Sequence, residues 1–103
     1  MRRKIEAVRE KMSASEILCQ LAEECAELSQ AALKLRRAIS KDNPTPIDER
    51  KALENMVEEI ADVSLSLRVL GIDNSNPDVC LRVVQITNQK MDRWIDRLSS
   101  KLK

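Results

Sequence analysis

Apolar residues that recur at every third or fourth position constrain the fold of this chain more than any other feature of its sequence. Such spacing places side chains along one stripe of an α-helix. The clearest stripe consists of Ile17, Leu18, Leu21, Cys25, Leu28, Ala32 and Leu35. The 103 residues include only one Gly, three Pro and one aromatic residue, Trp94, so strand formers and turn residues are scarce. The sequence therefore predicts an all-α protein.

Capping residues predict where the first long helix begins. Ser13 and Glu16 have the spacing of a capping box, in which each side chain accepts a hydrogen bond from the backbone of the other. The helix is therefore expected over about 14–39. The segment 41–44, Lys-Asp-Asn-Pro, is expected to be a loop.

A second start signal predicts the next helix. Thr45 is the expected N-cap and Pro46 the first helical residue, with Asp48 and Glu49 in the first turn, where the helix dipole favours acids. Gly71 is a suitable C-cap. The second long helix is therefore expected from about Pro46 to Leu70.

The remaining segments predict a third long helix and allow a short one. Asn76–Asp78 repeats the start signal, and an apolar stripe continues almost to the C-terminus. That stripe consists of Cys80, Val84, Met91, Ile95, Leu98 and Leu102. Residues 2–12 allow a short additional helix with Ile5, Val8 and Met12 on one side.

The second half of the helix over 46–70 carries apolar residues around nearly its whole circumference. They are Val63, Leu65, Leu67, Val69 and Leu70. One neighbouring helix cannot cover all of them, so a partner subunit is expected. The predicted fold is a single domain over 1–103 that forms a bundle of three long antiparallel helices, with a short fourth helix possible at the N-terminus. Assembly into a homo-oligomer, either a dimer or a tetramer, is expected to complete the bundle.

The net charge and the cysteines of the sequence indicate which binding partners and which cellular compartment to expect. Lys plus Arg is 18 and Asp plus Glu is 17, so the net charge of +1 predicts neither a nucleic-acid nor a membrane partner. The chain has no apolar run of the roughly 20 residues that a membrane span needs. Cys19, Cys25 and Cys80 lack C-x-x-C spacing and are interpreted as small core residues of a reducing compartment, which predicts a cytoplasmic location.

Two acidic segments of the same form are the candidate site. The first long helix contains Glu-Glu-Cys-Ala-Glu and the second contains Glu-Glu-Ile-Ala-Asp. Residues at i and i+3 share one helix face, which pairs Glu24 with Glu27. In the second helix it pairs Glu59 with Asp62. Antiparallel packing of the two helices could bring the pairs together.

Carboxylates that converge in this way would need a counter-charge. Two of them repel by about 4 kcal/mol at roughly 4 Å with an effective dielectric constant of about 20, and a divalent cation removes that repulsion. Ligands that are all oxygens favour Mg²⁺ or Mn²⁺ over zinc. The alternative is that each acidic segment is an ordinary solvated helix face.

The two acidic segments also resemble a known pair of motifs. Leu21–Leu28 and Glu58–Val63 resemble the first and second motifs of the all-alpha NTP pyrophosphohydrolase superfamily, which includes MazG-like proteins, dimeric dUTPases and phosphoribosyl-ATP pyrophosphohydrolases. The resemblance implies a Mg²⁺-dependent hydrolase that converts an NTP or dNTP to the monophosphate and pyrophosphate. Its metal ligands would be Glu24, Glu27, Glu59 and Asp62.

The third long helix carries the expected substrate-binding residues. Lys90, Arg93 and Arg97 lie on one stripe and resemble the phosphate-binding helix of the superfamily; the alternative is a solvated basic face. Asn88 falls on the apolar stripe, either to contact substrate or to specify the bundle. Trp94 is expected to pack in the core or at an interface, with stacking on a base as the alternative.

A non-catalytic protein remains the contrasting hypothesis. In that case the chain is a helical assembly module, and its acids and bases form only surface ion pairs. Oligomerisation does not separate the two hypotheses. Binding of a divalent cation does, because an assembly module has no reason to bind Mg²⁺. Within the superfamily, a dUTPase-like or dCTPase-like enzyme and a phosphoribosyl-ATP pyrophosphohydrolase-like enzyme are further alternatives.

Overall fold

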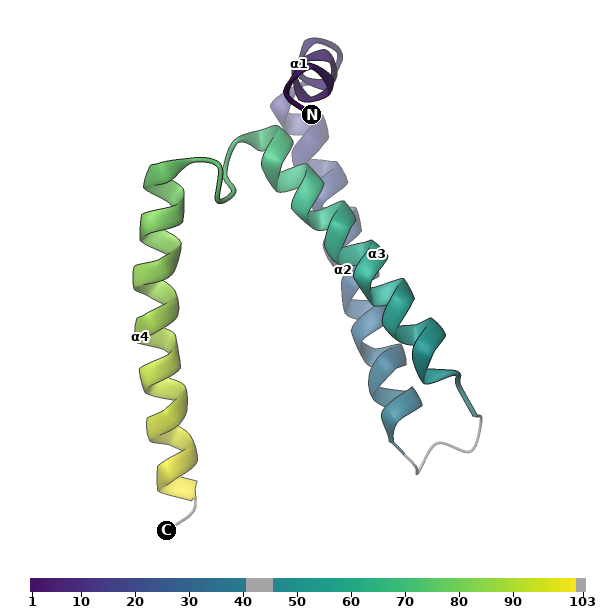
Figure 1. Ribbon diagram of the computed structural model, residues 1–103, viewed down its shortest axis with the longest axis vertical. Coiled ribbons are helices and arrows are strands. Elements are labelled where there is room, and N and C mark those ends of the chain that lie inside the picture. Colours follow the sequence, from purple (N-terminus) through teal and green to yellow (C-terminus); the bar gives the residue numbers. More distant parts are fainter. Residues whose placement is uncertain (41–45, 102–103) are drawn as a thin grey trace. The chain divides into compact units, whose positions relative to one another are not determined.

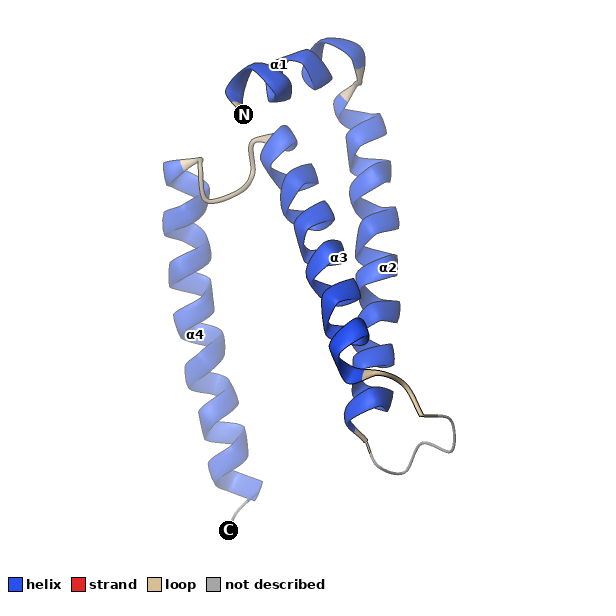
Figure 2. Cartoon of the chain, turned by 45° about the vertical axis from the view of Figure 1, so that its right-hand side comes forward, coloured by secondary structure: helices blue, strands red, loops and turns tan. Residues whose placement is uncertain are grey.

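The computed structural model describes residues 1–40 and 46–101, and the regular structure in these residues is entirely helical (Figures 1 and 2). The helices are α1 (Arg2–Lys11), α2 (Ala14–Ile39), α3 (Glu49–Leu70) and α4 (Pro77–Lys101). The predicted all-α class is confirmed for this part of the chain. None of these helices is both long enough and apolar enough to cross a membrane.

The chain divides into two compact units. Unit 1 is Met1–Gly71 and contains α1, α2 and α3, whereas unit 2 is Ile72–Lys103 and contains α4. Two of the three long helices expected in one bundle therefore belong to unit 1 and the third belongs to unit 2. Packing of α4 into a bundle with α2 and α3 stays a prediction.

Unit 1 is built on an antiparallel hairpin of α2 and α3, which pack along each other (Figures 1 and 2). Small residues allow the two helices to approach closely. Ala31 on α2 and Ala52 on α3 are both buried, and Ala52 keeps only 1% of its surface exposed. The hairpin fixes which residues of α2 face α3, and it therefore positions the candidate site.

The predicted start of α2 is confirmed. The backbone N–H of Glu16 donates to Oγ of Ser13 at 3.1 Å, and the N–H of Ser13 donates to Oε1 of Glu16 at 3.2 Å. These two hydrogen bonds satisfy amides that have no partner within the helix. The helix then runs to Ile39, as expected.

The predicted start of α3 is wrong by three residues. Pro46 is not helical, and the helix begins at Glu49 with Asp48 as its N-cap. Oδ1 of Asp48 accepts hydrogen bonds from the amides of Arg50 at 3.0 Å and Lys51 at 3.3 Å. A carboxylate at this position both caps the helix and suits its dipole. Thr45 and the predicted loop over 41–44 lie outside the described residues.

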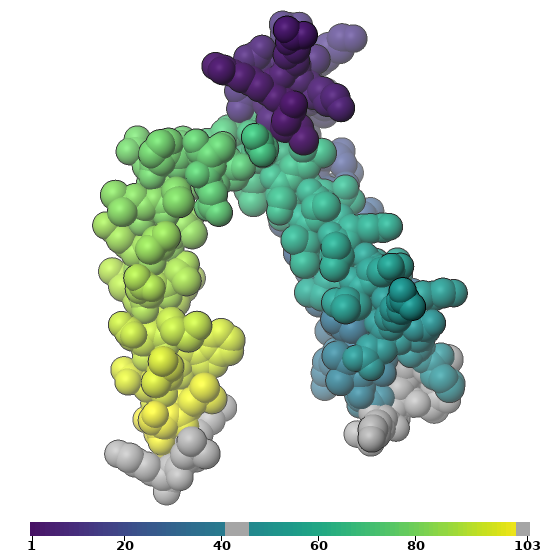
Figure 3. Space-filling view, viewed as in Figure 1, coloured from purple at the N-terminus to yellow at the C-terminus, as the bar shows by residue number. Residues whose placement is uncertain are grey.

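The far end of α3 is closed by a glycine and tied to α1. Gly71 has φ 75°, the left-handed conformation predicted for this C-cap. Nε of Arg9 donates to the carbonyl of Val69 at 2.7 Å, and Nη2 donates to that of Arg68 at 3.3 Å. A cation that binds carbonyl oxygens at a helix C-terminus also interacts favourably with the helix dipole. Figure 3 shows α1 gathered over this end of unit 1.

The core of unit 1 is small and lies beneath α1. Ile5, Ile17 and Val69 are buried there, with Met12 and Leu70 packed against them. Many large apolar residues of α2 and α3 remain about half exposed. They are Leu18, Leu33, Ile39, Leu53, Val57, Ile60 and Leu65. Cys19 and Cys25 are also exposed, so their interpretation as core residues is wrong.

Helix α4 of unit 2 begins at its predicted cap. Oδ1 of Asn76 accepts hydrogen bonds from the amides of Asp78 at 3.1 Å and Val79 at 3.4 Å, and Pro77 is the first helical residue. Four members of the predicted apolar stripe are about half exposed: Val84, Met91, Ile95 and Leu98. The last member, Leu102, lies outside the described residues.

Candidate metal centre

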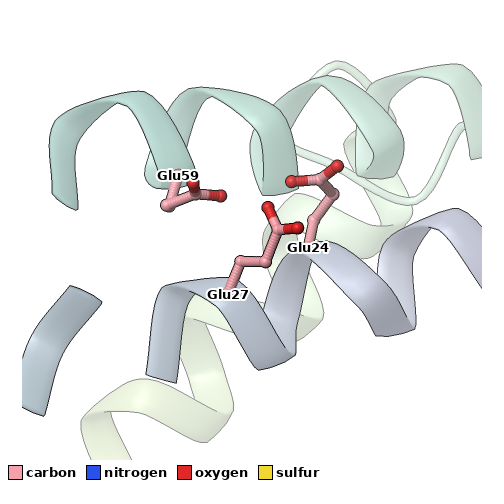
Figure 4. A group of neighbouring side chains, drawn as sticks. All are labelled: Glu24, Glu27 and Glu59. Atoms are coloured by element: carbon pink, nitrogen blue, oxygen red, sulfur yellow. The ribbon is translucent and has the colours of Figure 1, made fainter. Parts of the chain in front are cut away.

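Three carboxylates from two helices meet between α2 and α3. One oxygen each from Glu24, Glu27 and Glu59 lies within 4.8 Å of the others. Figure 4 shows the three side chains pointing toward one another, two from α2 and one from α3. Glu24 and Glu27 share a face because they are three residues apart, and the antiparallel hairpin brings Glu59 opposite them. We call these three residues the carboxylate cluster.

Two members of the carboxylate cluster are partly withdrawn from solvent. Glu24 and Glu59 are half-buried, whereas Glu27 is exposed. Oε2 of Glu24 and Oε2 of Glu59 are both buried, and no hydrogen-bond partner among the described residues reaches either atom. Burying a carboxylate oxygen without a partner is unfavourable. The cluster therefore contains two oxygen atoms that a cation would satisfy.

Hydrogen bonding orders one of the three side chains. Nε2 of Gln20, one turn before Glu24 on α2, donates to Oε1 of Glu24 at 2.8 Å. This bond satisfies Oε1 of Glu24, whereas the buried Oε2 has no partner among the described residues. Gln20 therefore positions a candidate ligand, a role that the sequence had not suggested.

The surroundings raise the pKa of Glu59 from 4.5 to about 7. Burial is the largest cause, followed by the negative charge of Glu27 and a hydrogen bond with that residue. The charges of Glu24 and Asp62 add to the effect. Each of these disfavours the ionised form. Near neutral pH, and without a cation, Glu59 is therefore partly protonated.

Asp62, the predicted fourth ligand, has a different environment. It lies three residues after Glu59 on α3 but is exposed, and its carboxylate is not one of the three that converge. It still acts on the site, because its charge contributes to the raised pKa of Glu59. Glu23 and Glu58, the first acids of the two segments, are also exposed and stand outside the cluster.

The chemistry of these donors fits a hard divalent cation. All of them are carboxylate oxygens, which Mg²⁺ and Mn²⁺ prefer, and Mg²⁺ keeps several of its waters when only a few carboxylates bind it. Glu24, Glu27 and Glu59 could hold such an ion directly. Asp62 lies three residues after Glu59 on α3, the spacing that places two side chains on the same helix face.

A polar cavity of about 500 Å³ opens beside the cluster, between α2 and α3. Its lining residues are Glu27, Gln30, Ala31, Lys34, Arg37, Asn55 and Glu59. Lys34, Arg37 and Asn55 were not among the expected site residues. The sequence does contain a signal for the residues on α2, because they follow Glu27 at helical spacing, but no pattern indicates Asn55.

An apolar cavity of about 320 Å³ lies on the other side of the cluster, under α1. It is lined by Met1, Lys4, Ile5, Val8, Met12, Ile17, Gln20, Leu65, Ser66 and Val69. Gln20 belongs both to this cavity and to the hydrogen bond with Glu24. The cavity is therefore about one helical turn from the cluster along α2.

The expected substrate-binding residues lie on α4, in unit 2. Lys90, Arg93 and Arg97 line one surface together with Trp94 and Asp96. Trp94 is 57% exposed, so the chain does not bury it in a core. Asn88 is exposed as well. The three cations are thus grouped as their spacing predicted, and their role toward a substrate stays a prediction.

The chain has no significant match among protein-family models, curated proteins or solved structures. The resemblance to the NTP pyrophosphohydrolase superfamily therefore rests on the two acidic motifs and on the basic residues Lys90, Arg93 and Arg97.

Proposed function

We propose that this protein is a divalent-cation-dependent nucleoside triphosphate pyrophosphohydrolase. The observation that supports it best is the convergence of Glu24, Glu27 and Glu59, because two of their buried oxygens have no hydrogen-bond partner among the described residues. A solvated acidic face would leave these oxygens in water. The substrate class comes from the resemblance of both acidic motifs to those of the superfamily.

Each residue of the site has a distinct part in the proposed reaction. Glu24, Glu27 and Glu59 would hold Mg²⁺ or Mn²⁺, with Asp62 as a further candidate ligand. When bound, such an ion lowers the pKa of a coordinated water and neutralises charge on the leaving pyrophosphate. A carboxylate of the cluster orients the attacking water toward the α-phosphate. Cleavage between the α- and β-phosphates yields the monophosphate and pyrophosphate.

The cations of α4 are proposed to bind the substrate. Lys90, Arg93 and Arg97 carry donors that suit phosphate oxygens. Asn88 is proposed to contact the substrate with its amide. These residues belong to unit 2, whereas the carboxylate cluster belongs to unit 1.

The apolar cavity of unit 1 suits the nucleoside part of such a substrate. Ligand cavities of this kind combine a mostly apolar lining with a few polar groups, and they span about 300–1,000 Å³. Here the polar groups are Lys4, Gln20 and Ser66. Without an aromatic residue in the lining, a base would be held by apolar contact and hydrogen bonds rather than by stacking.

Assembly and location complete the proposal. The exposed apolar residues of α3 and α4 are proposed to pack in a homo-oligomer, a dimer or a tetramer, because isolated monomers rarely expose so many. Exposed free thiols at Cys19 and Cys25 are compatible with a reducing compartment, and a cytoplasmic location is proposed.

A helical assembly module is the second candidate. The observation that favours it is the long exposed apolar stripe of α4, which includes Met91, Ile95 and Leu98. Such a stripe is typical of helices that associate. The module hypothesis gives no role to the carboxylate cluster, so cation binding separates it from the enzyme.

A substrate screen tests the enzymatic proposal. The purified chain is incubated with each common NTP and dNTP in Mg²⁺, and release of pyrophosphate and monophosphate is measured. We expect at least one nucleotide to be cleaved to these two products, and we expect EDTA to stop the reaction. Release of inorganic phosphate instead of pyrophosphate, or no cleavage of any nucleotide, would contradict the proposal.

A further inference from the structure

The polar cavity of unit 1 has acids at one end and bases at the other. Glu27 and Glu59 of the carboxylate cluster line its first part, and Lys34 and Arg37 line its second. All of these residues come from the single hairpin of α2 and α3. The cavity is therefore a bipolar site within one unit.

The order of these residues along α2 gives the cavity a direction. Lys34 lies seven residues after Glu27 and Arg37 lies ten after it, which corresponds to about 10 Å and about 15 Å along the helix axis. Asn55 precedes Glu59 by one turn on α3. Because α3 runs antiparallel to α2, Asn55 lies on the same side of the cluster as the two bases.

The helix itself gives Lys34 no ion-pair partner. On α2 the positions one turn before and one turn after it are Gln30, Ala31, Arg37 and Ala38, none of which is acidic. Like charges at i and i+3 disfavour each other on a helix. Arg37 lies in the last turn of α2, where the dipole favours a cation, but Lys34 lies before that turn. Lys34 therefore makes no ion pair within α2.

The mixed charge of the cavity restricts the ligand that fits it. Glu27 and Glu59 would repel a free anion, and a cation alone would occupy only the acidic end of the cavity. A ligand that carries a divalent cation at one end and anionic oxygens beyond it matches both ends. A metal-bound polyphosphate is such a ligand, and a cavity of about 500 Å³ lies within the usual size of ligand sites.

We propose that Lys34 and Arg37, together with the amide of Asn55, bind the polyphosphate chain of the substrate beside the carboxylate cluster. This inference rests on the proposed function, and it adds a phosphate site on α2 to the one expected on α4. The phosphates extend from the cation toward the C-terminal end of α2. Lys34 and Arg37 donate to phosphate oxygens, which lowers their mutual repulsion.

Calorimetric titration with inorganic triphosphate tests this site without relying on catalysis. The wild type is compared with the double variant Lys34→Gln, Arg37→Gln, with and without Mg²⁺. We expect Mg²⁺ to tighten triphosphate binding by the wild type, and the double variant to bind Mg-triphosphate about tenfold or more weakly. Both residues are exposed, so the variant is expected to fold, which circular dichroism checks.

Arg36→Gln is the matched control. Arg36 is adjacent to Arg37 in the same last turn, has the same charge, and lies on a different face beside Ala32, Leu35 and Ile39. Its substitution should change triphosphate binding by no more than about twofold. If Arg36→Gln weakens binding as much as the double variant does, the effect is one of general charge and the proposed site is wrong.

Mg²⁺ binding without triphosphate separates this inference from the proposed function. The double variant should bind Mg²⁺ as the wild type does, whereas Glu59→Gln should lose it. If the double variant binds Mg-triphosphate as tightly as the wild type while Glu59→Gln loses Mg²⁺, the carboxylate cluster stands and the phosphate site is wrong. If the wild type binds neither Mg²⁺ nor Mg-triphosphate, both proposals are wrong.

Discussion

Glu59 is the side chain whose chemistry depends most on its neighbours. Burial and the adjacent charges raise its pKa to about 7, so near neutral pH it holds a proton that an exposed glutamate would have released. A divalent cation reverses this balance, because it attracts the ionised form that the neighbours disfavour. Cation binding and proton release at Glu59 are therefore expected to be linked.

The raised pKa of Glu59 predicts a pH dependence of stability in EDTA. Between its unfolded value of 4.5 and its folded value of about 7, the folded state binds a proton that the unfolded state does not. The contribution of Glu59 to the free energy of unfolding is therefore fully present below about pH 4.5 and is lost as the pH rises through 7. Thermal melts of the wild type and Glu59→Gln, recorded from pH 5 to pH 8, measure it.

The difference between the two melting temperatures isolates this effect from other titrating groups. We expect the wild type to lose stability relative to Glu59→Gln as the pH increases, because glutamine carries no titrating proton. A difference that does not change between pH 5 and pH 8 would mean that the pKa of Glu59 is close to that of a free glutamate.

Substitution of Glu59 should separate catalysis from stability. Glu59→Gln keeps the shape of the side chain but removes its charge, so pyrophosphate release should fall about 100-fold or more, since loss of the groups that merely orient metal ligands costs about 10- to 100-fold. Stability in EDTA at pH 8 should stay equal or rise, because repulsion from Glu24 and Glu27 is relieved.

Glu54→Gln is the control for this substitution. Glu54 lies on α3 like Glu59, but it is exposed and outside the carboxylate cluster. Exposed substitutions of this kind usually change stability by no more than about 0.5 kcal/mol, and activity should be little affected. Equal activity of Glu54→Gln and Glu59→Gln on every nucleotide that the wild type cleaves would rule out the metal-site assignment.

At the scale of helices, the sequence predicted a helix end correctly where a single residue caps that end. Ser13, Gly71 and Asn76 each act through backbone atoms a few residues away, so local sequence contains the whole signal. The start of α3 was predicted at Thr45, because a proline follows it, with Asp48 inside the first turn. The capping hydrogen bonds are made by Asp48 instead.

The candidate site was predictable in part, for the same reason. Pairing of Glu24 with Glu27 follows from spacing within one helix, but the partners across the hairpin depend on how α2 and α3 are aligned. Spacing alone did not show that Asp62 is exposed while Glu59 joins the cluster. Nor did it show that Asn55 lines the same cavity as Lys34.

The tie between α1 and α3 gives a prediction about stability. Arg9 donates from Nε and Nη2 to two carbonyls at the end of α3, so Arg9→Gln should lower the free energy of unfolding by about 1 kcal/mol. Arg3→Gln, an exposed change in the same helix, is the control. Urea unfolding measures both. Equal stability of the two variants would show that the Arg9 contacts contribute nothing.

At the scale of the whole chain, more large apolar side chains are present than the small core buries. Ile5, Ile17 and Val69 form the buried cluster, and a domain of this size gains little stability from burial alone. Large apolar residues remain exposed on α2, α3 and α4. The sequence predicted such an excess on α3 from five residues, of which Leu65 is exposed, Val69 is buried and the other three are half-buried. Most of the exposed apolar surface of α3 lies earlier in the helix, at Leu53, Val57 and Ile60.

The excess apolar surface predicts an oligomer. The chain has a mass of 11.7 kDa, so light scattering at micromolar concentration should give at least twice that value. Association buries apolar area, so the mass should persist at high salt, which weakens only the charged contacts. A mass near that of one chain would contradict the proposed assembly.

Titration of Mg²⁺ into the metal-free protein at pH 8 tests the central claim most directly, because it measures whether the carboxylate cluster binds a divalent cation. The wild type and Glu54→Gln should bind Mg²⁺, and Glu59→Gln should not. The melting temperature of the wild type should rise with Mg²⁺, since a ligand at 100 times its dissociation constant stabilises the folded state by about 2.7 kcal/mol. No heat of binding and an unchanged melting temperature in millimolar Mg²⁺ would contradict the account.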